Sequence, residues 1–223
     1  MEDFTVARTK MVDNQLRTQN VTDYEVLAAM GEVPREQFVP RASRALAYID
    51  RDIMVKAAGP DGPARYLMEP APLARLVQLA EVEAGDVALV VGCGTGYSAA
   101  ILARLAGSVV ALESDAELAA RASETLAEQG IDNVSVVTGT LQDGYPAEAP
   151  YDVIFVDGAV EEVPTVLLDQ LKDAGRLVAV VGYGRSASAT QFRRSGEDIG
   201  SRVAFDADVQ PLPGFRKTKA FVF

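Results

Sequence analysis

The sequence predicts an α/β fold built on a mostly parallel, twisted sheet, with an antiparallel pair of strands at its C-terminal edge and a helical subdomain at its N-terminus. Short apolar runs alternate with helical patterns after Pro72, which is typical of parallel strands covered by helices on both faces. The last two apolar runs are joined by a Pro/Gly turn and no helix, which indicates antiparallel neighbours. Before Pro72 the apolar residues are spaced mainly as in helices.

The N-terminal subdomain, residues 1–70, is expected to pack on a core of residues 71–223, so that the whole chain is a single domain. Thr22 or Asp23 can cap the second of its helices, because both side chains accept hydrogen bonds from free backbone N–H groups. We expect helices at 5–19 and 24–33, a short turn at 34–38, and a loop at 59–65 that is a surface connection or, alternatively, a hinge.

The core elements follow from the positions of apolar runs and helix-ending residues. Gly130 stands just after an amphipathic stretch, at the position where glycine commonly ends a helix. In order, we expect a helix at 72–80, strands at 86–91, 108–113, 134–138, 151–156 and 176–181, helices at 116–130 and 163–175, and edge strands at 202–209 and 217–223.

Residues 87–113, VALVVGCGTGYSAAILARLAGSVVALE, combine a strand, a glycine loop, a helix and a second strand that ends on Glu113. Such a loop lets a ligand approach the backbone, and the acid can accept hydrogen bonds from two ribose hydroxyls. A dinucleotide site would have its third glycine where Tyr97 stands. The G-x-G-x-G spacing resembles instead the first motif of S-adenosylmethionine-dependent methyltransferases. A glycine-rich turn without a ligand is the alternative.

The amino-acid composition limits the kinds of partner and the cellular location that we expect. With 21 basic and 32 acidic residues, the formal charge of −11 opposes binding to nucleic acid phosphates. No apolar stretch approaches the roughly 20 residues that span a membrane, and the N-terminus has no apolar core typical of a signal peptide. We therefore expect a cytoplasmic protein that binds neither nucleic acid nor membrane.

The chain has no histidine and a single cysteine, Cys93. The first absence excludes histidine general bases, Ser-His-Asp relays and histidine metal ligands, and we expect no metal site. Methyl transfer to a carboxylate remains possible, because a carboxylate is ionised at neutral pH and needs no base. Cys93 could be a reactive thiolate at a helix N-terminus, but a small residue filling a tight turn is the simpler interpretation.

Several segments together resemble the protein-L-isoaspartate O-methyltransferase family. They are MVDNQLRTQNVTDYEVLAAM, VPREQFVP, GCGTGYSAAILARLAG, GYPAEAPYDVIFVDGAVEEVP and LLDQLKDAGRLV, which together extend from about residue 11 to about residue 182. The resemblance implies a Rossmann-like methyltransferase fold with extra N-terminal helices. It also implies S-adenosylmethionine as cofactor and, as partners, damaged proteins or peptides whose isoaspartyl carboxylates are methylated for repair.

The resemblance implies a set of cofactor-binding residues, with two departures from the family pattern. Val90 stands where the family usually has an acid before the loop, and Thr140 stands where it has an aspartate near the adenine amine. Asp157 ends a strand and is interpreted equally as a site residue or a helix cap. The candidates are Gly92, Cys93, Gly94, Gly96, Tyr97, Glu113, Ser114, Thr140, Leu141 and Asp157.

The acceptor loop departs as well. The family reads close to Ile-Ser-Gln-Pro, whereas this chain reads Leu67-Met68-Glu69-Pro70. The catalytic positions therefore map to Met68, which offers no hydrogen-bond donor, and Glu69, which would repel a carboxylate. Arg65 could replace the missing donor, but an arginine in a loop is more often solvated, and we expect that here.

The leading hypothesis is a methyltransferase for isoaspartyl carboxylates, acting mainly by holding the carboxylate in line with the methyl group. Two alternatives keep the fold. One is an enzyme that methylates a different acceptor, and the other is an inactive relative that binds the cofactor or a partner protein. The sequence does not indicate an oligomeric state.

Overall fold

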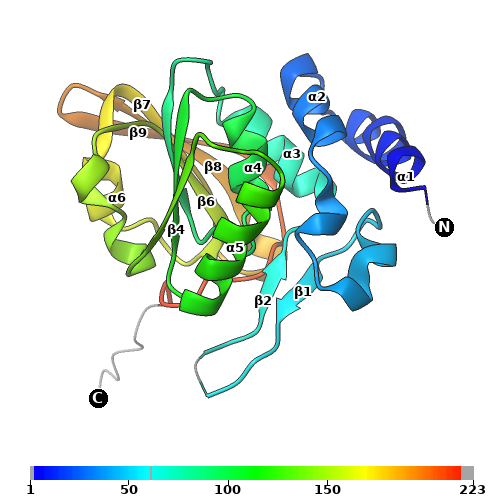
Figure 1. The fold of residues 1–223 in the computed structure, drawn as a ribbon. Coiled ribbons are helices and arrows are strands. Elements are labelled where there is room, and N and C mark those ends of the chain that lie inside the picture. Colours follow the sequence, from blue (N-terminus) through cyan, green and yellow to red (C-terminus); the bar gives the residue numbers. More distant parts are fainter. Residues whose placement is uncertain (1–2, 61, 217–223) are drawn as a thin grey trace.

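The computed structural model describes residues 3–60 and 62–216. Its centre is a seven-stranded sheet with the order β5-β4-β3-β6-β7-β8-β9, accompanied by a separate two-stranded hairpin, β1-β2 (Figure 1). The sheet strands are β3 (Val87–Val91), β4 (Ser108–Glu113), β5 (Val134–Thr138), β6 (Tyr151–Val160), β7 (Leu171–Val181), β8 (Ser188–Ser195) and β9 (Asp198–Asp206).

The first five strands of the sheet are parallel, as predicted. Val90 in β3 lies opposite Ala111 of β4 and Phe155 of β6. From β3 the chain continues through β4 to β5 on one side, and the later strands β6 and β7 extend on the other side. The direction of winding therefore reverses between β3 and β6, and in open α/β sheets ligands bind beyond the carboxyl ends of the strands at this point.

The antiparallel edge pair is present, but other residues form most of it. It consists of β8 and β9, joined by a turn at Gly196, where φ is +60°. The sequence predicts strands at 202–209 and 217–223. The first of these only overlaps β9, and the second lies outside the described residues. Arginines at the solvent end of β8, in the stretch SATQFRRS, interrupt the apolar run that usually identifies a strand.

The helix expected at 163–175 is much shorter. α6 covers only Thr165–Asp169, and β7 begins at Leu171, which pairs with Tyr151 of β6. Ala174 has a φ of +62°, and a helix does not accept this conformation. Pairing along the sheet thus overrides a helical spacing of apolar residues in this segment.

The N-terminal helices largely agree with expectation. α1 (Phe4–Met11) continues as a π-helical turn, Val12–Leu16, and a 3₁₀ turn, Arg17–Gln19. α2 (Tyr24–Glu32) is capped by Asp23, whose carboxylate accepts two backbone N–H bonds. Further 3₁₀ turns cover Arg35–Gln37 and Arg41–Leu46.

The hairpin is the main departure within the first 70 residues, where the helical expectation is wrong. β1 (Ile53–Lys56) and β2 (Arg65–Leu67) pair antiparallel. In each strand buried and exposed side chains alternate, with Ile53 and Leu67 inside. Runs of three or four residues are too short to show this alternation clearly in a sequence. The hairpin projects below the sheet, beside the lower end of α5 (Figure 1).

Helices cover both faces of the sheet. α3 (Pro70–Leu79), α4 (Tyr97–Ala103) and α5 (Ala116–Glu128) share one continuous apolar core with the N-terminal helices. α6 and Leu212 belong to the core on the opposite face. Among the described residues, no helix is both long and apolar enough to cross a bilayer.

Arg176 connects the end of α3 to β7 and offers a test of the fold. Its buried guanidinium donates to the carbonyls of Ala80 and Glu81 and forms a 2.6 Å ion pair with Asp86. Replacing Arg176 with methionine leaves a buried carboxylate without its counter-ion, which should cost about 3 kcal/mol of unfolding free energy. Urea denaturation checks this value.

The matched control is Arg193→Met on the neighbouring strand. Arg193 is half exposed and lies 3.7 Å from an equally exposed Glu81 carboxylate, so its loss should change stability by less than about 0.5 kcal/mol. Equal losses in the two variants would contradict the role given to Arg176.

Candidate functional site

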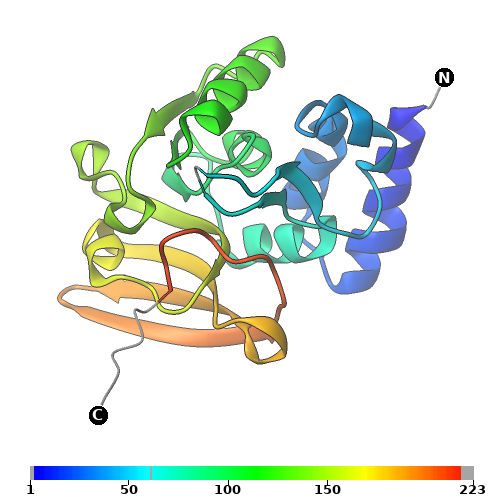
Figure 2. The ribbon, with the colours of Figure 1, turned by 90° about the horizontal axis from the view of Figure 1, so that it is seen from below.

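The candidate site lies at the carboxyl edge of the parallel strands, where the winding direction reverses. Figure 2 looks at the molecule from this side, and both the β1-β2 hairpin and residues 207–216, drawn in red, lie across the edge. The glycine loop after β3, Glu113 at the end of β4 and Asp157 in β6 meet here.

The glycine loop needs its glycines for their conformation. Gly92, Gly94 and Gly96 have φ values of +83°, +56° and +95°, which are unfavourable for residues with a Cβ. Gly96 also lets α4 approach α5, because a methyl group built on it would lie 3.2 Å from the Cβ of Ala122. The loop thus brings α4, with its backbone N–H groups, close to the ligand position expected from the sequence.

Glu113 is completely buried, and its carboxylate is surrounded by donors from its own chain. Oε2 accepts a hydrogen bond from the backbone N–H of Gly94 at 2.8 Å. Oε1 accepts from the backbone N–H groups of Ser114 at 2.8 Å and Asp115 at 3.1 Å. The predicted ribose-binding acid is therefore held rigidly by backbone groups.

Arg65 forms a bidentate ion pair with this carboxylate. Its Nη1 donates to Oε1 of Glu113 at 2.6 Å and its Nη2 to Oε2 at 2.9 Å. Only 6% of Arg65 is exposed, so the expectation of a solvated loop residue is wrong. Burial alone would lower the pKa of Arg65, but the Glu113 carboxylate outweighs burial and raises it. The sequence could not indicate the pairing of Arg65 with Glu113, because β2 is only three residues long and is not recognisable as a strand.

Leu212 fills the crevice between the carboxyl ends of β3 and β6. A methyl group built on Gly92 or on Gly158 would lie 2.7 Å from the Leu212 side chain. Two backbone hydrogen bonds of 2.9 Å hold the segment in place, from Ala159 N–H to Gln210 and from Leu212 N–H to Ala159. The sequence interpretation missed this segment, because it placed a strand and a Pro/Gly turn there.

Two cavities, each of about 410 Å³, flank this segment. The first is lined by residues at or just after the ends of β4 and β5 and by a turn of the C-terminal segment: Ser114, Thr138, Gly139, Thr140, Leu141, Gln142, Pro213 and Gly214. The second lies between the hairpin and the same turn and is lined mainly by apolar residues: Pro63, Ala64, Tyr66, Pro211, Leu212 and Pro213. Residues 212–214 thus separate two spaces that would otherwise adjoin.

Three predicted cofactor residues, Ser114, Thr140 and Leu141, line the first cavity together. Thr140 is exposed there, whereas Leu141 is buried. Val90 is fully buried in the core shared with the helices, where a charged residue would have to be desolvated. The structure therefore groups the adenine-side candidates and keeps Val90 apart from them.

Tyr97 and Cys93 have different surroundings from those expected of ligand contacts. The ring of Tyr97 packs 5.5 Å from Phe38 and 4.9 Å from the Arg35 guanidinium, in the core toward the N-terminal helices. Cys93 is 1% exposed, and burial, followed by the Glu113 charge, raises the pKa of its thiol well above the usual value. The structure thus favours the space-filling interpretation of Cys93 over a reactive thiolate.

The two acceptor-loop residues point to different places. Met68 is buried beside Asp157 and Gly158 in a small space at the end of β6. Glu69 instead lines a 260 Å³ cavity with the acidic residues Asp50 and Asp208. Burial and the nearby Asp52 carboxylate raise the pKa of Glu69. Only Met68 of this pair lies next to the other site candidates.

Asp157 lies within β6, and α6 begins later with Pro164 at its N-cap. The helix-cap alternative is therefore wrong. Its carboxylate accepts a 2.6 Å hydrogen bond from the Ser98 hydroxyl of α4. Burial raises the pKa of Asp157 to about 6, although Ser98 and Arg65 act in the opposite direction. Asp157 is thus a carboxylate with a raised pKa at the carboxyl edge of the sheet.

This raised pKa predicts a pH-dependent gain in stability for Asp157→Asn. A carboxyl group whose folded pKa lies above its unfolded value destabilises the folded state when ionised. This cost begins as the pH rises above the unfolded pKa of about 4 and is complete above the folded pKa of about 6. The variant should be closest to the parent near pH 4 and exceed it by about 1 to 2 kcal/mol at pH 8. Urea unfolding at both pH values measures the difference, with Asp198→Asn on exposed β9 as control. A gain independent of pH would contradict the titration.

Among the described residues, no group of three or more Cys, Asp or Glu side chains is arranged to hold a metal ion. The site consists instead of backbone donors, one buried ion pair and hydroxyl groups around cavities. Such a site suits an organic ligand with hydroxyl and amine groups.

Comparison with known proteins identifies the relatives of this chain. Residues 7–207 match the family model described as protein-L-isoaspartate(D-aspartate) O-methyltransferase. A protein-L-isoaspartate O-methyltransferase of Koribacter versatilis is 40% identical over 211 residues, which cover 95% of this chain and 92% of that protein. One from Methanoculleus marisnigri is 42% identical over 175 residues, 78% of this chain and 77% of that protein.

Solved structures agree with this assignment. A protein-L-isoaspartate O-methyltransferase superposes with a TM-score of 0.80 at 27% identity, covering 93% of this chain, which spans 66% of that protein's length. A Plasmodium falciparum protein described as a putative enzyme of the same kind, solved with S-adenosyl-L-homocysteine, has a TM-score of 0.76 at 20% identity and supports the fold. Because the family model matches most of this chain, the chain belongs to the protein-L-isoaspartate O-methyltransferase family and has its Rossmann-like methyltransferase fold.

Proposed function

We propose that the protein transfers a methyl group from S-adenosylmethionine to the carboxylate of isoaspartyl residues in damaged proteins or peptides. The observation that carries the proposal is the position of the glycine loop and Glu113 at the reversal point of the sheet, next to a cavity of about 410 Å³. Relatives that are 40% or more identical to this chain over the aligned residues have the corresponding name.

The residues fit one end of the cofactor better than the other. Ser114, Thr140 and Leu141 line a cavity large enough for an adenine ring and present a hydroxyl group for its amine. At the other end, Arg65 pairs with Glu113 and Leu212 lies against Gly92. The ribose and the methionine portion of the cofactor do not fit beside these side chains as they stand.

Methyl transfer to a carboxylate needs no side chain that acts as an acid or a base. An isoaspartyl carboxylate is already ionised at neutral pH, and a sulfonium methyl group is an electrophile that the cofactor supplies when bound. The protein's contribution is to place the carboxylate in line with the methyl group and exclude water. Met68 and Asp157, side by side at the end of β6, would border the acceptor.

The same proposal places the protein in the cytoplasm, in protein repair, with proteins or peptides and not nucleic acids as substrates. Its formal charge of −11 supports this choice, because a polyanion would be repelled at long range. The charge favours no particular damaged protein.

A second candidate is a relative that binds the cofactor without methylating isoaspartyl groups, or that methylates another acceptor. The buried Met68 favours it, because a thioether offers no donor to a carboxylate. The position of Glu69 among Asp50 and Asp208 also adds negative charge near the loop, which disfavours a carboxylate acceptor.

A binding measurement followed by an assay distinguishes these functions. We expect calorimetry to detect S-adenosylhomocysteine binding and an isoaspartyl peptide to receive label from methyl-labelled S-adenosylmethionine, while the same peptide with normal aspartate remains unlabelled. Binding without label transfer would favour the second candidate. No binding at millimolar cofactor would reject both methyltransferase functions.

The double variant Met68→Ser with Thr140→Asp tests which residues limit the activity. A serine hydroxyl can donate to the acceptor carboxylate, and an aspartate can form a charge-assisted hydrogen bond with the adenine amine. Each is worth roughly 1 to 3 kcal/mol, so methyl transfer to the peptide should rise at least tenfold. Met54→Ser, an exposed methionine on β1, is the control. An unchanged rate in the double variant would show that the limitation lies elsewhere.

A further inference from the structure

The hydrogen-bonding capacity of Glu113 is already used within the chain. A carboxylate offers about four lone-pair sites. The backbone N–H groups of Gly94, Ser114 and Asp115 and the two guanidinium nitrogens of Arg65 donate to its two oxygens. Two ribose hydroxyls therefore have no free acceptor positions on this carboxylate.

The backbone donors and Arg65 differ in one respect. Gly94, Ser114 and Asp115 belong to the loops that hold Glu113 itself, and their N–H groups cannot leave without disrupting the sheet edge. Arg65 comes from the hairpin, which reaches the site from a distant part of the chain. It is therefore the donor that a ligand can replace.

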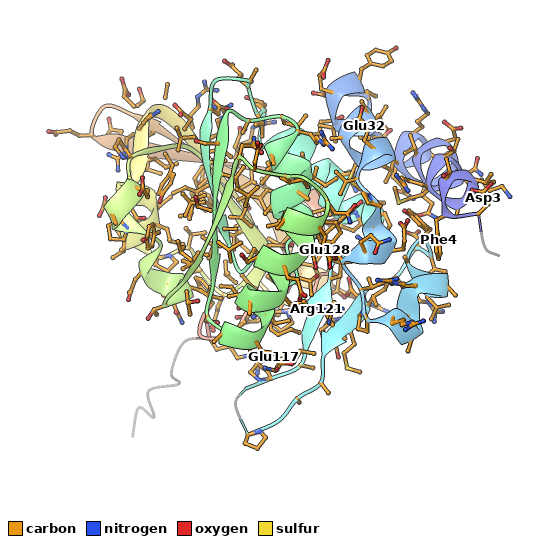
Figure 3. All side chains as sticks on the ribbon, in the orientation of Figure 1. Asp3, Phe4, Glu32, Glu117, Arg121 and Glu128 are labelled. Atoms are coloured by element: carbon orange, nitrogen blue, oxygen red, sulfur yellow. The ribbon has the colours of Figure 1, made fainter. Side chains whose placement is uncertain are left out.

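The hairpin is held at this edge by apolar packing and by polar contacts. Ile53, Val55 and Leu67 of its strands belong to the apolar core shared with the helices. Besides the Arg65 pair, Lys56 lies 2.6 Å from Asp115 and 2.9 Å from the exposed carboxylate of Glu117. Figure 3 shows Glu117 at the lower end of α5, the end next to the hairpin. The hairpin loop also faces the apolar cavity of about 410 Å³ beside residues 210–214, so there is space next to it for a displaced side chain.

We propose that Arg65 sets the cofactor affinity of this site, because the ribose and the Arg65 guanidinium compete for the same carboxylate. The cofactor binds when Arg65 leaves Glu113 and residues 212–214 move from between the two cavities, which then form one cleft. This inference rests on the proposed function only in taking an adenosine-bearing ligand as the competitor.

Exchanging Arg65 for the ribose hydroxyls as the partner of Glu113 is unfavourable, so the parent protein should bind the cofactor weakly. A bidentate ion pair between opposite charges is replaced by hydrogen bonds from neutral hydroxyls to the carboxylate, so the buried charge of Glu113 loses its counter-ion when the ligand binds. Glu113 keeps its three backbone donors after Arg65 leaves, so the buried carboxylate stays hydrogen-bonded. Removing the guanidinium should therefore improve ligand binding and not destroy the site.

The test is calorimetric titration of S-adenosylhomocysteine into the parent protein, Arg65→Ala and Arg65→Lys. We expect Arg65→Ala to bind about tenfold more tightly or better, and Arg65→Lys, which keeps the charge but loses the bidentate geometry, to lie in between. Arg51→Ala, an exposed arginine two residues before β1, should bind like the parent. Equal or weaker binding by Arg65→Ala, or no binding by any of these proteins, would overturn the proposal.

A second measurement uses the parent protein and does not depend on a variant that folds. Hydrogen exchange with saturating S-adenosylhomocysteine should become faster at the backbone amides of β1, β2 and residues 210–214, while those of β3 and β4 become slower. Unchanged or slower exchange in the hairpin with ligand bound would also overturn the proposal. Tighter binding by Arg65→Ala without methyl transfer to the peptide would refute the proposed function and leave this inference intact.

Discussion

The ion pair between Arg65 and Glu113 is the interaction on which the candidate site depends. It joins the hairpin, which lies within the first 70 residues, to the end of β4, the strand next to the β5 edge of the sheet. Both groups are almost completely buried, and in this arrangement the charge of each compensates that of the other. The positions of Lys56, Tyr66 and Met68 follow from it, because all three lie in or next to the hairpin strands.

A second buried arginine connects the N-terminal helices with the same region. Arg35 donates from Nε to the carbonyl of Ala47 and from Nη2 to that of Met68, and its guanidinium lies over the ring of Tyr97. It therefore connects the segment before β1, the loop at Met68 and the first residue of α4. Because of this contact, the helices before residue 50 help to determine where Met68 lies in the site.

These two arginines give the site an unusual electrostatic character for a pocket expected to receive a positively charged cofactor. Glu113, the completely buried acid at the end of β4, is neutralised by Arg65, and Asp157 is a carboxylate whose pKa lies near 6. The remaining attraction for a cation at this site depends on the protonation of Asp157.

Local patterns in the sequence determined the parallel strands, the glycine loop, the helix caps and the acid at the end of β4. These features depend on residues that are close together in the chain, and apolar runs, glycines and caps report them directly. The family segments added the expected class of cofactor and acceptor, with Met68 and Thr140 as departures.

Only the tertiary structure decided that Arg65 is buried against Glu113, that Leu212 lies between β3 and β6, and that β8 pairs with β9. Each joins residues whose neighbours in sequence resemble ordinary loop or polar segments. The energy of a buried ion pair or of a side chain in a crevice depends on what surrounds it in space. For that reason the sequence predicts a cofactor-binding loop, although in the folded protein the side chains of Arg65 and Leu212 occupy the site next to it.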